Sequence, residues 1–323
     1  LIFSNASTAK TAITNIMSTA HQNFNKQVKK TSSNQTSAQQ KEKIQRGIAR
    51  ACASVNDLEV AAEYSKRLET KLLQEVDETY SRKETDQIRL CIKSLSPVTN
   101  SYSSASLRAI DQLVSTLLPR IRSIINDAVG QESTTGFSLA GGSSSAVNSI
   151  KMNYDLDDHA YEMTQISEGY INRLCSSLDE MFCMFRLYLA PRLSDVLLLG
   201  VIGAACKRME ASIRRCQITT LGALALDSDV RFFINFVKER VDSTKFSSNV
   251  ALYKSCNPLA RLGQIALLMN VDDLEDVLDL ISSCKRKGHW DLKLDDAKSF
   301  LNLRKDFEGR KVNELLHIPG EKE

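Results

Sequence analysis

The sequence predicts an all-α protein, an elongated stack of antiparallel helical bundles that ends in a small C-terminal helical bundle. Two observations carry this prediction. The 323 residues include 13 glycines and 5 prolines, about half the usual share of turn-forming residues, which is too few for a β-sandwich or barrel. Apolar residues recur at steps of three and four along most of the chain, and no stretch alternates strand and helix patterns.

The first half predicts three helices and two loops. We expect a helix over about 1–29, a flexible linker from Thr31 to Gln40, and a helix that begins at Asn56, where Glu59 completes a capping box. The next helix is interrupted by Pro119, and the segment from Gln131 to Ser145 is a loop. The apolar seam of the helix that contains Pro119 consists of Leu107, Ile110, Val114, Leu117, Ile121, Ile124 and Ala128.

The second half predicts one long helix and several shorter ones. The long helix spans about 158–189, and the next begins at Pro191, a favourable first position. Further helices are expected from the caps at 227–229, after Pro258, from Asp272, and as a pair over about 294–316. The buried stripe of the long helix is predicted to be Met163, Ile166, Tyr170, Leu174, Leu178, Met181, Phe182 and Phe185.

These elements suggest three parts. Residues 1–52 hold N-terminal helices and the flexible linker, 53–220 form the main helical bundle, and 221–323 form the small C-terminal bundle. The chain begins with Leu1 rather than Met, so we expect it to be a piece of a longer protein.

Composition argues for a protein that meets other proteins. The hydrophobic share of 42% supports a continuous core, and 42 basic and 39 acidic residues are interspersed, giving a net charge of +3. That balance argues against a nucleic-acid partner. The eight cysteines form no CxxC pair, which favours reduced core thiols over metal or disulfide use. The longest apolar run, 196–206, is too short to span a membrane.

No pattern of catalytic residues is evident. The sequence contains no HExxH, GxSxG or GxxxxGK[ST] motif, and its four histidines are isolated from the cysteines. The acidic residues Asp157 and Asp158 beside His159 are better explained as helix caps. We therefore predict a protein that is not an enzyme and uses no cofactor or metal.

One charge stands out in this pattern. Arg231 would lie in the first turn of a helix beginning at 227–229, where the helix dipole disfavours a cation. Such a position suggests an acidic partner nearby, although an exposed arginine without consequence is an equal alternative.

Five ordered segments resemble subunit 4 of the conserved oligomeric Golgi complex. Within 155–310, the chain matches that family's pattern at an "LSPxx" helix entry, an "LGGLQFD" segment and three C-terminal stretches. These segments read Leu189-Ala190-Pro191-Arg192-Leu193, Leu221-Gly222-Ala223-Leu224-Ala225-Leu226-Asp227, Ala260-Arg261-Leu262-Gly263-Gln264 with Leu274-Glu275-Asp276-Val277-Leu278-Asp279, Trp290-Asp291-Leu292, and Leu301-Asn302-Leu303-Arg304-Lys305-Asp306-Phe307.

The resemblance implies a non-catalytic scaffold of stacked helical bundles. Such a subunit would act in vesicle tethering during retrograde intra-Golgi transport, as a peripheral protein on the cytoplasmic face of Golgi membranes. Its partners would be other subunits of the complex, and further SNAREs, Sec1/Munc18 proteins and Rab GTPases. The alternatives are a subunit of another helical-rod tether, such as an exocyst-type complex, and a peripheral lipid-binding helical module.

The resemblance also implies site residues. Arg231 matches the arginine after the "LGGLQFD" segment, and Asp296 matches an acidic position after the tryptophan, so the two are expected to form an ion pair; Asp295 is an equally placed acid. The residues of the C-terminal bundle motif are Trp290, Leu292, Leu303, Arg304, Asp306 and Phe307.

Overall fold

A computed structural model describes residues 37–79, 85–129, 152–166, 169–241, 249–286 and 290–315. The described residues form helices and no named strand; isolated bridges join three short extended segments. The all-helical prediction is therefore confirmed. The expected helix over 1–29 and the loop 131–145 lie outside the described residues.

The chain divides into two compact units. Unit 1 consists of Leu1–Thr116 and Met181–Leu197, and unit 2 consists of Leu117–Glu180 and Leu198–Glu323. The division falls within three helices, α4 (Ser96–Val129), α6 (Tyr170–Tyr188) and α7 (Pro191–Ile213). The expected domain boundaries after residues 52 and 220 stay predictions.

In unit 1, the helix expected to begin at Asn56 begins earlier. Helix α2 runs from Ser37 to Thr79 and packs against α3 (Thr85–Lys93), so the predicted linker is helical from Ser37. Asn56 is not a cap: its side chain donates to the Tyr188 carbonyl oxygen (2.7 Å) and accepts from the Ala190 amide (2.9 Å). This asparagine fastens the end of α6 and the start of α7 to α2, and that role produced the misleading capping pattern.

The helix expected over 158–189 is two helices. Helix α5 (Asp158–Ile166) opens with the Asp157 carboxylate accepting from the Ala160 amide (2.7 Å), which confirms the capping interpretation. Helix α6 begins at Tyr170, after Gly169. The α6 part of the predicted stripe is buried, but Met163 and Ile166 are 49% and 81% exposed. That part of the stripe was wrong because α5 ends at Ile166 and α6 begins at Tyr170, so the two helices do not share one helical register.

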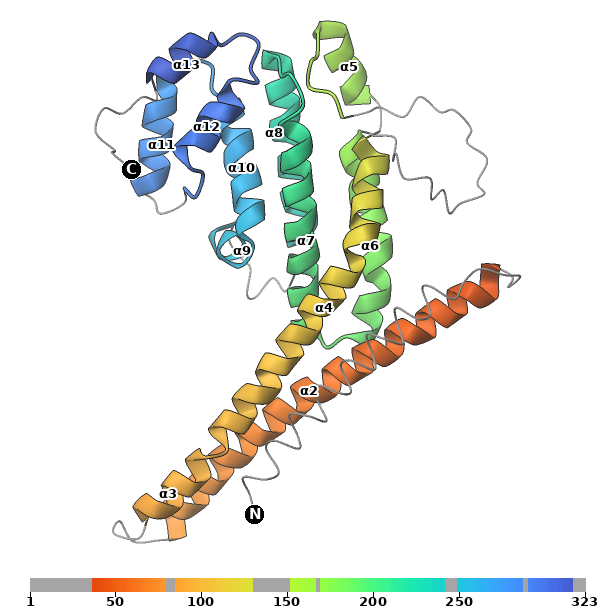
Figure 1. Ribbon diagram of the computed structural model, residues 1–323, viewed down its shortest axis with the longest axis vertical. Coiled ribbons are helices and arrows are strands. Elements are labelled where there is room, and N and C mark those ends of the chain that lie inside the picture. The colour runs from red at the N-terminus through yellow and green to blue at the C-terminus, as the bar shows by residue number, and fades with distance from the viewer. Residues whose placement is uncertain are drawn as a thin grey trace. The chain divides into compact units, whose positions relative to one another are not determined.

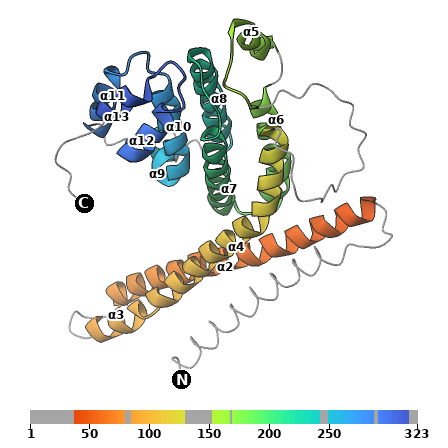
Figure 2. The same ribbon diagram turned by 45° about the horizontal axis from the view of Figure 1, so that its top comes forward.

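Unit 2 is built around α8 and α10. Helix α8 (Thr220–Lys238) packs against α10 (Asn257–Met269) and α5. Helix α10 also contacts α9 (Asn249–Ser255) and α12 (Leu294–Leu301), and α12 contacts α13 (Gly309–Leu315). Figures 1 and 2 both show α10 surrounded by α8, α9 and α12. Fully buried side chains such as Phe233, Leu262 and Phe300 fill the core between these helices.

Some predicted helix starts are confirmed and others are corrected. Helix α7 begins at Pro191, as expected, whereas α10 begins at Asn257 and holds Pro258 in its first turn instead of starting after it. Helix α11 (Asp276–Arg286) begins four residues after Asp272. Helix α8 begins at Thr220, not at 227–229, because the Thr219 hydroxyl caps it by accepting from the Gly222 amide (3.1 Å).

Within the described residues, no helix is both long and apolar enough to cross a membrane. The eight cysteines are free thiols; four of them, Cys52, Cys175, Cys206 and Cys256, are buried. Burial raises the pKa of Cys52 and Cys175 to about 12, so these thiols are unreactive core groups.

Candidate functional site

The structure gives both members of the predicted Arg231–Asp296 pair other partners. Arg231 Nε lies 2.7 Å from Asp227 Oδ2, four residues earlier in the same helix, and the Arg231 side chain is 70% exposed. Asp296 instead pairs with Arg214 (2.8 Å) and Arg261 (3.2 Å). The premise also changes, because α8 begins at Thr220 and Arg231 therefore lies in its third turn, away from the unfavourable helix end.

Asp296 belongs to a four-residue ion network in the core of unit 2. Glu210 of α7 accepts from Arg214 (2.9 Å) and from Arg261 of α10 (2.8 Å), and both arginines reach Asp296 of α12. The four side chains are between 16% and 32% exposed. Arg214 also lies over the ring of Phe300, 4.2 Å from its centroid. The network thus ties three helices together through charge-assisted hydrogen bonds.

The electrostatics of this network favour its charged form. Burial raises the pKa of Glu210, but the hydrogen bonds from Arg261 and Arg214 outweigh it, and the net pKa is lowered. The pKa of Asp296 is lowered in the same way. Both carboxylates therefore stay ionised at neutral pH.

Arg304 of the predicted C-terminal motif is a buried clamp. Its side chain is 1% exposed, and its guanidinium forms a two-pronged pair with Asp306, with Nε 2.7 Å from Oδ1. The opposite edge donates to the carbonyl oxygens of Met269 and Val271, the latter at 3.2 Å, at the end of α10. The Phe307 ring lies 4.4 Å from the guanidinium carbon. A single side chain thus satisfies helix-end carbonyls and fixes the chain after α12.

The other motif residues lie close by but have different roles. The Leu303 carbonyl accepts from the Ile218 amide (2.9 Å), and the Lys305 amide donates to the Ile218 carbonyl (2.9 Å). Leu292 is buried, and its amide donates to the Gln264 side chain (3.0 Å). Trp290 is half-buried.

The segment 152–156 lies against the start of α8 at close range. The Thr219 amide donates to the Tyr154 carbonyl (3.1 Å), and the Thr219 hydroxyl donates to the Leu156 carbonyl (2.8 Å). A Cβ on Gly222 would lie 1.7 Å from the Tyr154 carbonyl oxygen, so only glycine fits there. This contact holds Tyr154 against the start of α8 within unit 2.

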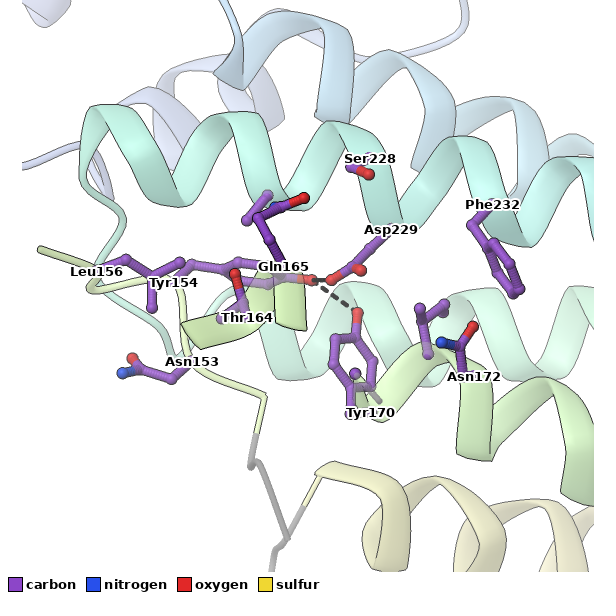
Figure 3. A pocket seen from close by; sticks show the side chains of 13 residues that line it. Asn153, Tyr154, Leu156, Thr164, Gln165, Tyr170, Asn172, Ser228, Asp229 and Phe232 are labelled. Carbon is purple, nitrogen blue, oxygen red and sulfur yellow. Dashed lines mark hydrogen bonds between the residues drawn. The ribbon is translucent and has the colours of Figure 1, made fainter. Parts of the chain in front are cut away.

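Tyr154 lines a hollow of about 210 Å³. Its hydroxyl lies 2.7 Å from that of Tyr170 and donates to Asp229 Oδ2 (3.1 Å). Figure 3 shows these three side chains converging from the segment 152–156, from α6 and from α8, with Phe232 farther along α8. Asn153, Thr164, Gln165, Asn172 and Ser228 complete the polar lining.

Burial controls the charge of this hollow. Burial raises the pKa of Asp229 to about 6, and the hydrogen bond from Tyr154 lowers it by a smaller amount. Burial also raises the pKa of both tyrosines well above the usual value, so their hydroxyls stay neutral. Asp229 is the one charged residue among the thirteen described residues that line the hollow, and it is ionised at pH 7 or above.

Sequence reasoning missed the two residues that define this hollow. Asp229 was interpreted as a helix cap, and Tyr154 was not singled out. One signal was present. The apolar residues Val230, Phe233, Ile234 and Val237 recur at helical steps on one face, and Phe232 lies off that face; an aromatic residue there indicates exposed apolar surface. The described residues contain no cluster of side chains with metal-ligand geometry.

Comparisons with known proteins assign the family. The family model described as "Conserved oligomeric Golgi complex subunit 4, C-terminal" matches residues 51–299. Proteins named "Conserved oligomeric Golgi complex subunit 4" from Arabidopsis thaliana, Drosophila melanogaster and Homo sapiens are 20%, 22% and 18% identical to the chain. The matches cover 81%, 84% and 81% of this chain and 31%, 32% and 30% of those relatives.

The chain therefore spans about a third of the length of these relatives. Their matches extend over most of this chain, and the family model covers residues from both units. The helical fold agrees with the resemblance seen in the sequence. The chain belongs to the family of the C-terminal part of conserved oligomeric Golgi complex subunit 4.

Proposed function

We propose that this chain is part of a subunit of the conserved oligomeric Golgi complex, and that it works as a non-catalytic scaffold. The observation that carries the proposal is the family match over 51–299. The described structure supports a scaffold role, because its most elaborate polar groups, the Glu210 network and the Arg304 clamp, hold helices to one another.

In this proposal the protein acts in vesicle tethering during retrograde intra-Golgi transport. Its partners are the other subunits of the complex, and beyond them SNAREs, a Sec1/Munc18 protein and Rab GTPases. It lies on the cytoplasmic face of Golgi membranes and associates with them indirectly, through these proteins.

Affinity purification tests the proposal. The full-length protein is tagged in its own cells, purified at moderate salt and analysed by quantitative mass spectrometry. We expect the other subunits of the Golgi complex in near-equal amounts. Recovery of exocyst subunits, or of unrelated proteins alone, would overturn the assignment. Liposome co-sedimentation of the purified chain separates the lipid-binding alternative, which requires direct binding to anionic vesicles.

A further inference from the structure

A groove runs between α6 and α8 on unit 2. The hollow lined by Tyr154, which we call the inner hollow, shares the lining residues Asn172 and Phe232 with a second hollow of about 770 Å³, which we call the outer hollow. The lining of the outer hollow continues along α6 to Glu180 and along α8 to Phe236, and it includes Glu239 and Arg240 just after α8. We call the two hollows together the α6–α8 groove.

The groove has the length of a short helix. On α8 its lining extends from Ala225 to Phe236, eleven residues apart, which corresponds to about 17 Å at the ~1.5 Å rise of an α-helix. Lining residues on both helices recur at helical spacing, so one face of α6 and one face of α8 form its two walls. This length corresponds to about three turns of a partner helix.

The groove is acidic. Its charged lining residues are the carboxylates of Asp229, Asp179, Glu180 and Glu239, and the guanidinium of Arg240. Arg240 is engaged within the groove, because it contacts Asp179 (2.6 Å) and Glu239 (3.3 Å) and lies over the Phe236 ring. The lining therefore carries a net charge of −3 when all five groups are ionised.

An exposed aromatic side chain stands at the junction of the two hollows. Phe232 is 47% exposed, whereas its neighbour Phe233 is fully buried in the core. A phenyl ring beside carboxylates contacts both parts of a long basic side chain: its face attracts the cation, and its edge packs against the methylene stem.

We propose that the α6–α8 groove docks a basic, amphipathic segment of a partner protein. One arginine or lysine of that segment enters the inner hollow and meets Asp229, its stem packs on Phe232, and further cations face Glu180 and Glu239. The inference deepens the proposed function by specifying the chemistry of a partner, and it rests on that function only in taking the partner to be a protein.

Charge complementarity supports this occupant over others. Nucleic acid and anionic lipid would be repelled by the four carboxylates. A free amine of low mass would fill the inner hollow but would leave the outer hollow, with its two exposed acids Glu180 and Glu239, without a role.

Fluorescence anisotropy tests the proposal on the whole chain at pH 7.5. The probe is a fluorescein-labelled, 18-residue helical peptide of leucine and alanine with four arginines along one side. The control probe replaces each arginine by citrulline, which has nearly the same shape and no charge. We expect the arginine peptide to bind, the citrulline peptide to bind at least about tenfold more weakly, and added salt to weaken the arginine peptide selectively.

Matched variants locate the binding. Asp229→Asn keeps an acceptor for the Tyr154 hydroxyl and is expected to weaken binding about tenfold or more. The double variant E180Q/E239Q changes only exposed side chains, so it tests the groove without disturbing the core. Glu314→Gln removes an exposed charge from α13 and should leave binding unchanged. Circular dichroism and thermal melts establish that each variant is folded.

The outcomes separate the two proposals. Absence of binding by the wild-type chain, equal binding of the citrulline peptide, or equal losses in Glu314→Gln and Asp229→Asn would each overturn the docking groove. Recovery of the Golgi complex subunits is measured independently, so failure of the groove leaves the proposed function standing. Conversely, a groove that binds basic peptide in a chain that recovers no Golgi subunits would refute only the proposed function.

Discussion

Replacing Arg304 should unfold unit 2 at markedly lower denaturant. The side chain is 1% exposed and satisfies the carbonyl oxygens of Met269 and Val271 on one edge and the Asp306 carboxylate on the other. Arg304→Met retains most of the volume but removes every donor. The buried carbonyl of Met269 and the partly buried carbonyl of Val271 then lose a donor, and the pair with Asp306 is broken. Removing one partner of a buried ion pair typically costs about 3–5 kcal/mol altogether, and that figure includes the groups left without a partner. We expect a loss of about 4 kcal/mol in the free energy of unfolding.

The protein contains its own probe for this measurement. Trp290 is the single tryptophan of the chain and lies in unit 2, between α11 and α12. Urea unfolding followed by its fluorescence reports the free energy of unfolding and the m-value, and an unchanged m-value shows that the change is one of stability. Lys305→Met is the matched control, because it removes the adjacent positive charge. Its pair with Asp155 is 44% and 43% exposed, so its loss should be below about 1 kcal/mol.

Acid dependence gives this prediction a second readout. The hydrogen bond from Arg304 lowers the pKa of Asp306. A lowered folded-state pKa means that the group contributes stability above its unfolded pKa of about 3.9, and that this contribution is lost as the pH falls below that value. In Arg304→Met this part of the acid sensitivity should disappear. A variant no less stable than Lys305→Met, with the same acid sensitivity as wild type, would refute the clamp.

Three further predictions follow from the same structure. Gly222→Ala should lower the free energy of unfolding by at least about 3 kcal/mol or prevent folding, because its Cβ would lie 1.7 Å from a backbone carbonyl oxygen. Gly203→Ala is the control: its Cβ would have ordinary contacts of 3.7 Å or more, so it should be neutral or slightly stabilising. Thermal melts compare the two variants. Arg261→Ala should cost about 2–4 kcal/mol in urea unfolding, and Arg231→Ala below about 0.5 kcal/mol; similar losses would contradict the revised pairing. Burial raises the folded-state pKa of Asp229 to about 6, so the stability of the wild-type protein should decline as the pH rises from 4 to 6. Asp229→Asn should be more stable than wild type at pH 7.5 and should show less of this decline, which thermal melts across that pH range measure.

The helices that the sequence predicted well are those whose signals are local. A proline in the first turn marks α7 and α10 correctly, because the fixed φ angle acts on its own residue and on no distant partner. The buried stripe of α6 likewise follows from a 3.6-residue period within one helix.

The errors have a common physical cause. Asn56 and Asp227 have the residue types of helix caps, but in the fold one joins α2 to the α6–α7 connection and the other pairs with Arg231. A short polar side chain suits all of these tasks equally, and only the tertiary structure decides between them. The same limit applies to the predicted partner of Asp296. The chain contains many arginines, and the packing of the helices places Arg214 and Arg261 beside Asp296.

Four acidic groups of unit 2 have shifted pKa values, three lowered and one raised, and the difference bears on function. Glu210, Asp296 and Asp306 have lowered pKa values, so each contributes stability in its charged form at neutral pH. Asp229 has a raised pKa, and the sign is opposite: its contribution is greatest below about pH 4 and declines as the pH rises through about 6. Its charge at pH 7 therefore opposes folding.

Because the ionised Asp229 carboxylate lowers the stability of the fold, a role other than folding must explain its presence. An asparagine in place of Asp229 would accept the same hydrogen bond from Tyr154 without the buried charge, so stability does not account for the carboxylate. A bound cation would account for it, because the ionised form would then be paired and its pKa would return toward the usual range. The proposed docking of a basic segment supplies that cation in the α6–α8 groove, where burial makes the charge of Asp229 unfavourable for the fold alone.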